Sequence, residues 1–250
     1  MTAEQKSFQA AKMAVHAAMV DRMDQEIGRI VEHLRDKKLL DDTLILFLSD
    51  NGASAEIMVR GDGHDPQAPA GSAETFLCLG PGWSSLCNAP LRRHKTWVHE
   101  GGISTPLIAH WPRRITDKGG LRTTPVHVID VAPTVLGLAG ATGDASQLND
   151  APARPGEEFA SLFARDVVRL ERTHWWSHEG NQALRDGDWK IVKTKKSAWE
   201  LYDLSTDRAE TRNVVATQPE RLRTLSERWE TLDRRFTHDA KRDMPASTKE

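Results

Sequence analysis

The chain has 250 residues, 38% of them hydrophobic, with 34 basic and 36 acidic residues and a formal net charge of −2. A chain of this length and apolar content can bury a sizeable core. Its balanced charge excludes a global attraction to nucleic acid or to an anionic membrane. No stretch is long and apolar enough to cross a bilayer, and no basic segment followed by an apolar run predicts a signal peptide on this chain.

A long amphipathic helix is predicted at the start of the chain. From about residue 4 to residue 38, apolar side chains recur every three or four positions, which is the spacing of one helix face. The apolar run at residues 44–48 then predicts a strand buried on both faces, as in a parallel sheet flanked by helices. A helix that leads directly into such a strand is typical of an α/β fold.

Polar residues follow this strand at the place where α/β proteins bind ligands. Asp50 and Asn51 lie beyond its carboxyl end, and Gly52 permits the turn that would let both side chains reach one ion. A carboxylate and an amide carbonyl are hard oxygen ligands, suited to Ca²⁺ or Mg²⁺. The same residues are also common turn formers, so both a metal pair and a plain turn remain open.

The next segment predicts a long loop that ends in a cationic stretch. Residues 53–94 lack periodicity and are rich in Gly, Pro, Asp and Ser. Residues 91–102 then concentrate cations and two histidines before a flexible diglycine, which makes this the stretch best suited to bind an anion. A solvated basic loop is the alternative. Residues 105–112 predict a second buried strand that starts at Pro106.

The second half of the chain predicts a smaller, separate region. The remaining elements are expected as a buried helix at residues 130–139, strands at 182–193 and 198–204, and a closing amphipathic helix at 219–236. The polar residues 141–157 indicate a boundary or a long surface excursion. We therefore expect one domain over residues 1–157 and a smaller subdomain over residues 158–250.

Several of these motifs occur together in a known order. They are DDTLILFLSDNG at 41–52, RRHKTWVHEGGISTPLI at 92–108, DVAPT at 130–134, EGN at 179–181 and GDWK at 187–190. In this order they closely resemble the C-terminal half of the sulfatases, and more narrowly of the bacterial arylsulfatases in the alkaline-phosphatase-like superfamily. The resemblance implies an α/β/α sandwich with a mostly parallel sheet, incomplete in its N-terminal part, followed by a small C-terminal antiparallel sheet and helix.

The resemblance also implies a metal and a substrate for specific residues. Asp50 and Asn51 match a late pair of calcium ligands, and Lys95 matches the lysine that contacts the substrate sulfate. A sulfate ester needs positive charge at its oxygens as the S–O bond breaks, which a divalent ion and a fixed ammonium supply. The implied cofactor is Ca²⁺, with Mg²⁺ second, and the implied substrate is a small-molecule or sugar sulfate ester.

Three histidines near these motifs are further candidates. His94 and His99 are placed to bind the leaving group or to protonate it, but a role as structural neighbours of Lys95 is the one we favour. Glu100 is expected to orient this loop through hydrogen bonds. His178, next to the EGN motif, is a candidate to approach the substrate. The particular ester, the cellular location and the oligomeric state have no readable signal in the sequence.

The nucleophile of the family is missing from the sequence. Sulfatases carry an early Asp-Asp pair on the first strand and a Cys/Ser-x-Pro-x-Arg motif whose first residue becomes formylglycine, and neither is present. Asp41-Asp42 is not that pair, because it precedes the later strand that leads to Asp50. In CNAPLR at residues 87–92 the proline stands one place too late, so Cys87 is rejected as the nucleophile, and both Cys78 and Cys87 are expected to be free thiols. Whether the chain is active alone is therefore left open. A catalytically silent segment, an anion-binding module and a phosphoesterase of the same superfamily are the alternatives.

Overall fold

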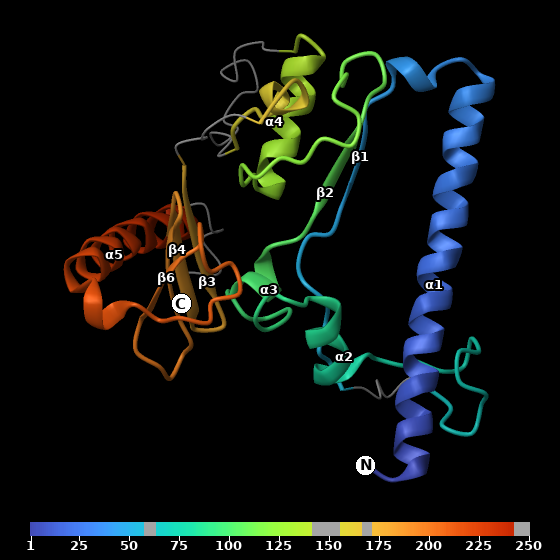
Figure 1. Cartoon of the computed structure of the whole chain (residues 1–250), viewed down its shortest axis with the longest axis horizontal. Helices are drawn as coiled ribbons and strands as arrows, with labels where there is room; N and C mark the ends of the chain where they lie inside the picture. The colour runs from blue at the N-terminus through green and yellow to red at the C-terminus, as the bar shows by residue number, and fades with distance from the viewer. Residues whose placement is uncertain (58–63, 142–155, 167–171, 243–250) are drawn as a thin grey trace. The chain divides into compact units, whose positions relative to one another are not determined.

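The computed structural model describes residues 1–57, 64–141, 156–166 and 172–242 (Figure 1). The chain forms two compact units. Unit 1 consists of Met1–Gln25, Asn51–Thr105 and Glu171–Glu250, and unit 2 of Glu26–Asp50 and Pro106–Leu170. The domain boundary expected at residue 157 stays a prediction. Among the described residues, no helix has both the length and the apolar character needed to span a membrane.

The predicted N-terminal helix is confirmed as α1, which runs from Ala3 to Asp36. In unit 1, polar groups near the start of α1 form hydrogen bonds with α2 (Gly80–Cys87) and with the residue before it. The Lys12 ammonium donates a hydrogen bond to the Leu79 carbonyl at 2.8 Å, and the Trp83 indole donates one to the Gln9 carbonyl at 2.9 Å. Helix α2 lies within the span where we expected only a loop, and Pro81 near its start supplies a φ angle already suited to a helix.

Unit 2 contains a two-stranded sheet made of β1 (Ile45–Leu48) and β2 (Leu107–His110). The strands pair in antiparallel register, with Leu48 opposite Leu107, so this pair does not show the parallel arrangement that we expected. The prediction that β1 is buried on both faces is wrong for the described chain, since Phe47 and Ile108 are 44% and 59% exposed. Alternate side chains of an antiparallel ladder face opposite sides, and only one side is packed here.

The packed side of this sheet carries the core of unit 2. Phe159, Leu162 and Phe163 are its buried centre. Leu46, Leu107 and Leu138 are among the partly buried residues that pack against these three. The other elements of this unit are the turns η1 (Leu40–Asp42), η2 (Val128–Asp130) and η4 (Ala160–Phe163), and helix α4 (Val131–Leu138). Helix α4 confirms the helix predicted at residues 130–139.

Unit 1 contains a four-stranded antiparallel sheet. Its strands are β3 (Thr173–His178), β4 (Asn181–Asp186), β5 (Trp189–Lys193) and β6 (Glu200–Asp203), in the order β3-β4-β5-β6. The span predicted as strand at residues 182–193 is a hairpin, because Gly187 adopts a φ of 61° and reverses the chain there. Strand β3 was not predicted, since its sequence THWWSH has no clean apolar alternation.

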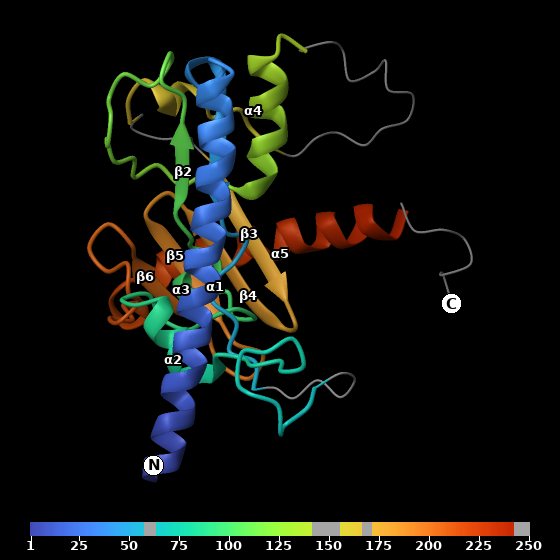
Figure 2. The same cartoon turned by 90° about the vertical axis from the view of Figure 1, so that its right-hand side faces the viewer.

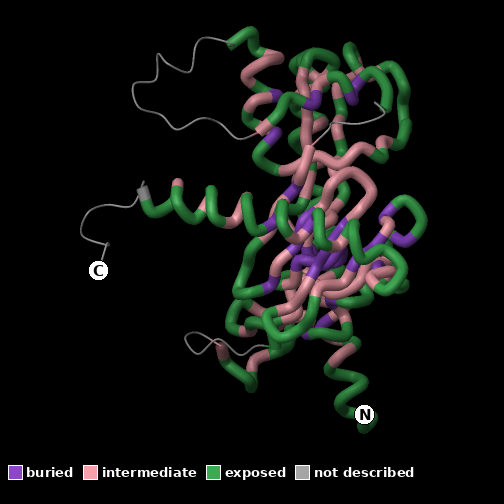
Figure 3. The backbone as a smooth tube through the Cα atoms, turned by 90° about the vertical axis from the view of Figure 1, so that its left-hand side faces the viewer, coloured by how far each residue is buried: buried purple, intermediate pink, exposed green. Residues whose placement is uncertain are grey.

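Both faces of the four-stranded sheet are covered, and they form two cores. Helix α5 (Pro219–Arg242), preceded by the turn η5 (Val215–Thr217), packs Leu225 and Trp229 on one face (Figure 2). On the other face, Val98 from the cationic stretch packs with Ala183, Val192, Tyr202 and Leu204. Figure 3 shows the buried residues concentrated in this sheet. The sheet therefore supports the loop in which we predicted the anion site.

Removal of a side chain from the first of these cores should destabilise unit 1. Leu201 has no exposed surface, so we expect Leu201→Ala to lower the free energy of unfolding by about 2 to 5 kcal/mol. Leu86→Ala is the matched control, because Leu86 is 60% exposed, and it should change that energy by about 0.5 kcal/mol or less. Urea unfolding followed by tryptophan fluorescence measures both. Equal effects of the two substitutions would contradict the assignment of this core.

Candidate functional site

The predicted anion-binding loop has an unusual backbone that presents Lys95 to solvent. Arg93 and Thr96, on either side of Lys95, have φ angles of 73° and 85°, in the left-handed region that residues other than glycine rarely adopt. Such conformations persist only where the surroundings enforce them. Here the Lys95 amide donates to the Ala53 carbonyl at 3.0 Å, and the Arg93 guanidinium lies 4.5 Å from the centre of the Trp97 ring. The Lys95 side chain itself is exposed.

The residues that follow Asn51 pack directly against this loop. The Gly52 amide donates to the Gly102 carbonyl at 3.0 Å, and the Ala53 amide donates to the Asn88 side chain at 3.0 Å. A Cβ on Gly52 would lie 1.8 Å from the Gly101 carbonyl oxygen, so only glycine permits this approach. The structure thus brings the segment after Asn51 and the Lys95 loop together within unit 1.

The diglycine that we expected to be flexible is buried and tightly packed. Gly101 and Gly102 belong to the short helix α3 (Glu100–Ile103). A Cβ on Gly101 would lie 2.4 Å from the Arg92 carbonyl oxygen, and one on Gly102 would lie 1.9 Å from the Trp97 carbonyl oxygen. These glycines therefore serve close contact between two backbone segments and do not mark a hinge.

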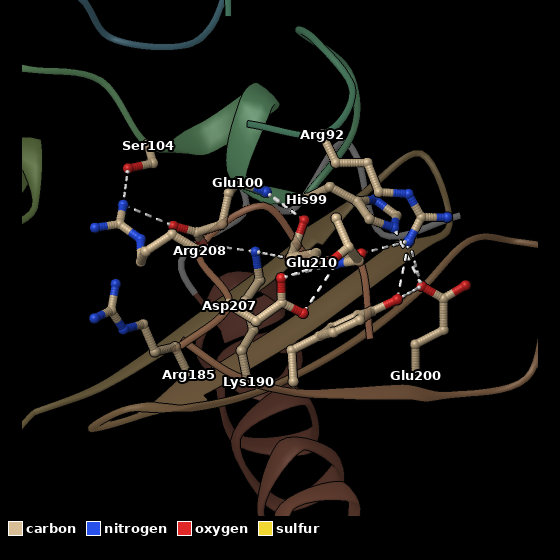
Figure 4. A network of polar contacts seen from close by, with 12 residues as sticks. Arg92, His99, Glu100, Ser104, Arg185, Lys190, Glu200, Asp207, Arg208 and Glu210 are labelled. Carbon is tan, nitrogen blue, oxygen red and sulfur yellow. Dashed lines mark hydrogen bonds and ion pairs between the residues drawn. The ribbon is translucent and has the colours of Figure 1, made fainter. Parts of the chain in front are cut away.

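A buried network of charges lies where α3 meets the four-stranded sheet (Figure 4). Lys190, on β5, has its ammonium 2.9 Å from Glu100 Oε1 and 2.8 Å from Glu210 Oε1. All three residues are at most 1% exposed. The Arg208 guanidinium lies 3.1 Å from the second oxygen of Glu100 and donates to the Ser104 hydroxyl at 2.9 Å. Glu100 is therefore held by two cations, which agrees with its expected role in orienting the loop.

The two carboxylates of this network have opposite pKa shifts. Burial raises the pKa of Glu100, but the positive charges of Lys190 and Arg208 outweigh burial and hold it below its usual value. Burial also raises the pKa of Glu210, and there the attraction of Lys190 offsets it only in part, so the pKa of Glu210 stays above its ordinary value. Glu100, which has Arg208 as a second cation, is thus the carboxylate whose charged form this network favours more strongly.

A second polar cluster anchors the other end of the loop. The Arg92 guanidinium donates to Glu200 Oε2 and to the Tyr202 hydroxyl oxygen, each at 2.9 Å. The Tyr202 hydroxyl donates to the same Glu200 oxygen at 2.7 Å, and burial together with this bond raises the pKa of Tyr202. Both ends of the segment from Arg92 to Glu100 are thereby fixed to β5 and β6 and to the loop after them.

The structure places the three predicted histidines in different surroundings. His94 is half-buried, and its Nδ1 lies 3.0 Å from the Lys95 carbonyl oxygen. His99 has no exposed surface, and its Nε2 lies 3.7 Å from Glu200 Oε2. His178 is exposed at the end of β3, opposite Asn181. The roles of these histidines stay predictions.

One contact joins the His178 turn to the Lys95 loop. The Asn181 side-chain amide donates to the carbonyl of Thr96, the residue after Lys95, at 3.3 Å. The start of β4 therefore lies against the loop that carries the predicted sulfate-binding lysine. The EGN motif was noted in the sequence, but its spacing from Lys95 gave no sign of this contact.

The network residues Lys190, Glu210 and Arg208 were not predicted. A sequence signal for one of them exists, because Lys190 interrupts the apolar strand WKIV, and a lysine within a buried strand needs an ionic partner. The partners themselves come from residues 90 positions earlier and 20 positions later, at Glu100 and Glu210, and sequence distance gives no hint of them.

The predicted metal site has only two side chains, Asp50 and Asn51, that supply oxygen ligands. Asp50 is exposed and Asn51 is half-buried, directly after β1. Among the described residues, no cluster of three or more His, Cys, Asp or Glu side chains is arranged to hold a metal ion. The donor types of Asp50 and Asn51 suit a hard cation such as Ca²⁺ or Mg²⁺, and they can form part of a coordination sphere of six to eight oxygens.

Comparison with known proteins decides the family. The model of the sulfatase family matches residues 1–141, and the model described as N-sulphoglucosamine sulphohydrolase, C-terminal, matches residues 93–237. The chain belongs to the sulfatase family. The C-terminal character of the second match agrees with the resemblance to the C-terminal half of these proteins.

Relatives of this sulfatase chain are longer than the chain. An uncharacterised sulfatase of Schizosaccharomyces pombe is 32% identical over 247 residues, which cover 92% of this chain and 44% of that protein. An arylsulfatase of Klebsiella aerogenes is 36% identical over 151 residues, covering 56% of this chain and 32% of that protein. The crystal structure of Ps i-CgsB in complex with k-i-k-neocarrahexaose matches with a TM-score of 0.65 at 25% identity, over 86% of this chain and 42% of that chain. The α/β fold class is therefore confirmed, and the chain spans less than half the length of these relatives.

The buried His99 should make the stability of this sulfatase chain depend on pH. Burial, with the nearby charges of Lys190 and Arg92, lowers the pKa of His99 from 6.5 to about 3, although Glu200 acts in the opposite direction. Between these pH values the unfolded chain binds a proton that the folded chain does not, so acidification favours unfolding. We expect His99→Phe to reduce the pH dependence of the unfolding free energy by up to about 1.4 kcal/mol per pH unit between pH 6 and 4.

Urea unfolding at several pH values measures this slope. The control is His33→Phe, which replaces an exposed histidine on α1 and should leave the slope as it is. An identical slope for the wild-type chain and His99→Phe would show that His99 takes up its proton in the folded state.

Proposed function

We propose that this chain forms part of an arylsulfatase-type sulfuric ester hydrolase. In this proposal Lys95 binds the sulfate group of the substrate, and Asp50 and Asn51 provide oxygen ligands to Ca²⁺. The observation that carries the proposal is the exposed Lys95 ammonium on a loop whose backbone is fixed against the residues after Asn51, in a chain of the sulfatase family. The substrate is proposed as a class, a small-molecule or sugar sulfate ester.

The residues present suit the binding of a sulfate group. A sulfate ester carries negative charge on its oxygens, and this charge increases on the leaving oxygen as the S–O bond breaks. An ammonium held by a rigid backbone stabilises that charge without reorganisation during the reaction. A calcium ion, when bound, would add positive charge next to the same oxygens. Asp50 and Asn51 offer it hard oxygen donors, as such an ion requires.

The neighbouring histidines take different parts in this proposal. His178, exposed at the end of β3 opposite the Asn181 that contacts the Lys95 loop, is proposed to approach the substrate. His94 lies next to Lys95 and is proposed to support it through the backbone. His99 has no exposed surface and no hydrogen-bond partner for its ring nitrogens among the described residues, which supports a structural part over proton transfer to a leaving group.

The nucleophile of the reaction is the group that this sequence does not supply. It contains no Cys/Ser-x-Pro-x-Arg motif, which sulfatases need for formylglycine. We therefore propose that this chain binds the sulfate group and the metal, and that turnover depends on a nucleophile from residues other than these. Binding of sulfate without turnover is also the signature of the alternative, an anion-binding or catalytically silent segment.

Replacement of Asp50 should weaken calcium binding. Loss of a charged oxygen ligand is expected to lower Ca²⁺ affinity about 10-fold to 100-fold, at least as much as loss of a residue that only supports a ligand. Isothermal titration calorimetry with CaCl₂ measures the affinity of the wild-type chain and of Asp50→Ala. Asp41→Ala is the matched control, because Asp41 is an exposed aspartate before the same strand. Equal affinities of all three proteins would contradict the proposed metal pair.

Replacement of Lys95 should remove sulfate binding. Titration of sodium sulfate into the chain is expected to show binding that Lys95→Ala lacks and that Lys196→Ala, a change of another exposed lysine in unit 1, retains. In a sulfatase completed with an N-terminal half, Lys95→Ala should reduce hydrolysis of 4-nitrophenyl sulfate about a hundredfold or more, since it removes a charge partner of the transition state. Near-normal hydrolysis in that variant would refute the assignment of Lys95.

A further inference from the structure

Lys190 occupies a position that stability alone does not explain. Its ammonium has no exposed surface and lies between Glu100 and Glu210, at 2.9 Å and 2.8 Å from their oxygens (Figure 4). Removal of an ammonium and two carboxylates from water carries a cost that their mutual attraction repays only when the geometry is favourable. Such a cluster can serve to select one arrangement of the segments that carry its charges. The segments joined here are β5, the start of α3 and the loop at residues 207–212.

The first link from Lys190 towards the candidate site runs through α3. Glu100 is the first residue of this helix, and the two glycines after it contact the Lys95 loop through their backbone. The Gly101 amide donates to the Arg92 carbonyl at 2.8 Å, and the Gly102 amide donates to the His99 carbonyl at 2.8 Å. A shift of Glu100 would therefore move the two glycine amides, whose hydrogen bonds fix the loop.

The second link reaches the segment after Asn51. The Gly102 carbonyl accepts from the Gly52 amide, and the next residue, Ala53, accepts from the Lys95 amide, both at 3.0 Å. The contact between Gly52 and Gly101 leaves no space for a methyl group, so the two backbone segments are packed directly against each other. The position of Lys95 and that of Asn51–Ala53 thus both depend on α3.

A third link fixes the backbone of Glu100 through the side chain of Glu210. Glu210 Oε2 accepts from the Glu100 backbone amide at 2.9 Å, while its other oxygen binds Lys190. The loop that carries Glu210 is itself held by Asp207, which accepts from the Thr211 and Arg212 amides at 2.9 Å and 2.8 Å. Both the side chain and the backbone of Glu100 are therefore fixed to the C-terminal sheet region.

We propose that Lys190 is a positioning residue of the candidate site. Through Glu100 and Glu210 it holds α3, and α3 holds the Lys95 loop and Asn51–Ala53 in one arrangement. The proposal rests on the proposed function where it concerns sulfate binding, but the arrangement of the backbone can be tested without it.

Hydrogen exchange tests the positioning directly. The amides of Gly52, Lys95, Gly101 and Gly102 are followed by nuclear magnetic resonance in the wild-type chain and in Lys190→Met. We expect these four amides to exchange at least tenfold faster in Lys190→Met, while the amides that pair β3 with β4 keep their rates. Lys193→Met is the matched control, the same substitution three positions along β5 at a lysine that contacts the Trp199 ring. Unchanged exchange of the four amides in a folded Lys190→Met protein would overturn the proposal.

Titration of sodium sulfate tests whether the positioning by Lys190 reaches Lys95. Lys190→Met is expected to weaken sulfate binding about tenfold, and Lys193→Met is expected to keep the affinity of the wild-type chain. Wild-type affinity in a folded Lys190→Met protein, or an equal loss in Lys193→Met, would overturn the proposal. Absence of sulfate binding by the wild-type chain would refute the proposed function alone, and the exchange rates would still decide the positioning role.

Glu210→Gln keeps the test decisive if Lys190→Met does not fold, as judged by circular dichroism. This substitution removes the charge of one carboxylate that binds Lys190 and keeps the size of the side chain. We expect the same four amides to exchange about threefold faster in Glu210→Gln. Wild-type rates in that variant would overturn the proposal in the absence of a folded Lys190→Met protein.

Discussion

The contact between Lys190 and Glu100 is the interaction on which the candidate site depends. It joins a strand of the C-terminal sheet to the first residue of α3, a helix of four residues. A helix this short has little stability of its own, because one turn gains too few hydrogen bonds to repay its ordering. Its conformation must come from packing and from this buried ion pair. The C-terminal sheet, which carries none of the proposed ligands of the metal, therefore has a direct part in shaping the site.

Local patterns in the sequence predicted the elements that have a strong period or a clear boundary. The 34-residue helix α1, the helix at residues 131–138 and the closing helix α5 follow from apolar spacing. The loop motif with Lys95 also followed from the sequence, through its resemblance to sulfatases. The buried network did not, because its carboxylates lie far from Lys190 along the chain and no local rule pairs them. Strand β3 was missed for a different reason, since it has a tryptophan on each of its two faces, which hides the alternation.

The exposed face of the two-stranded sheet in unit 2 explains why one expectation failed. A continuous apolar run predicts burial on both faces, but it does not say which chain segment provides the cover. In the described residues the side of β1 and β2 that carries Phe47 and Ile108 has no such cover, while the opposite side packs on Phe159, Leu162 and Phe163. The sequence pattern thus reported the apolar character of the strand correctly, and the burial inferred from it required a partner that these residues do not include.

The three tightly packed glycines have a consequence for the redesign of this protein. A Cβ added at Gly52, Gly101 or Gly102 would meet a carbonyl oxygen of the backbone, which cannot rotate out of the way as a side chain can. Mutagenesis that seeks new ester selectivity would lose its variants at these positions, although they contact the proposed sulfate-binding loop. Asn181 contacts the same loop at Thr96, and His178, which is exposed and lies opposite Asn181, has no such restriction. Diversity introduced there can alter the surroundings of Lys95 while the backbone that presents it stays intact.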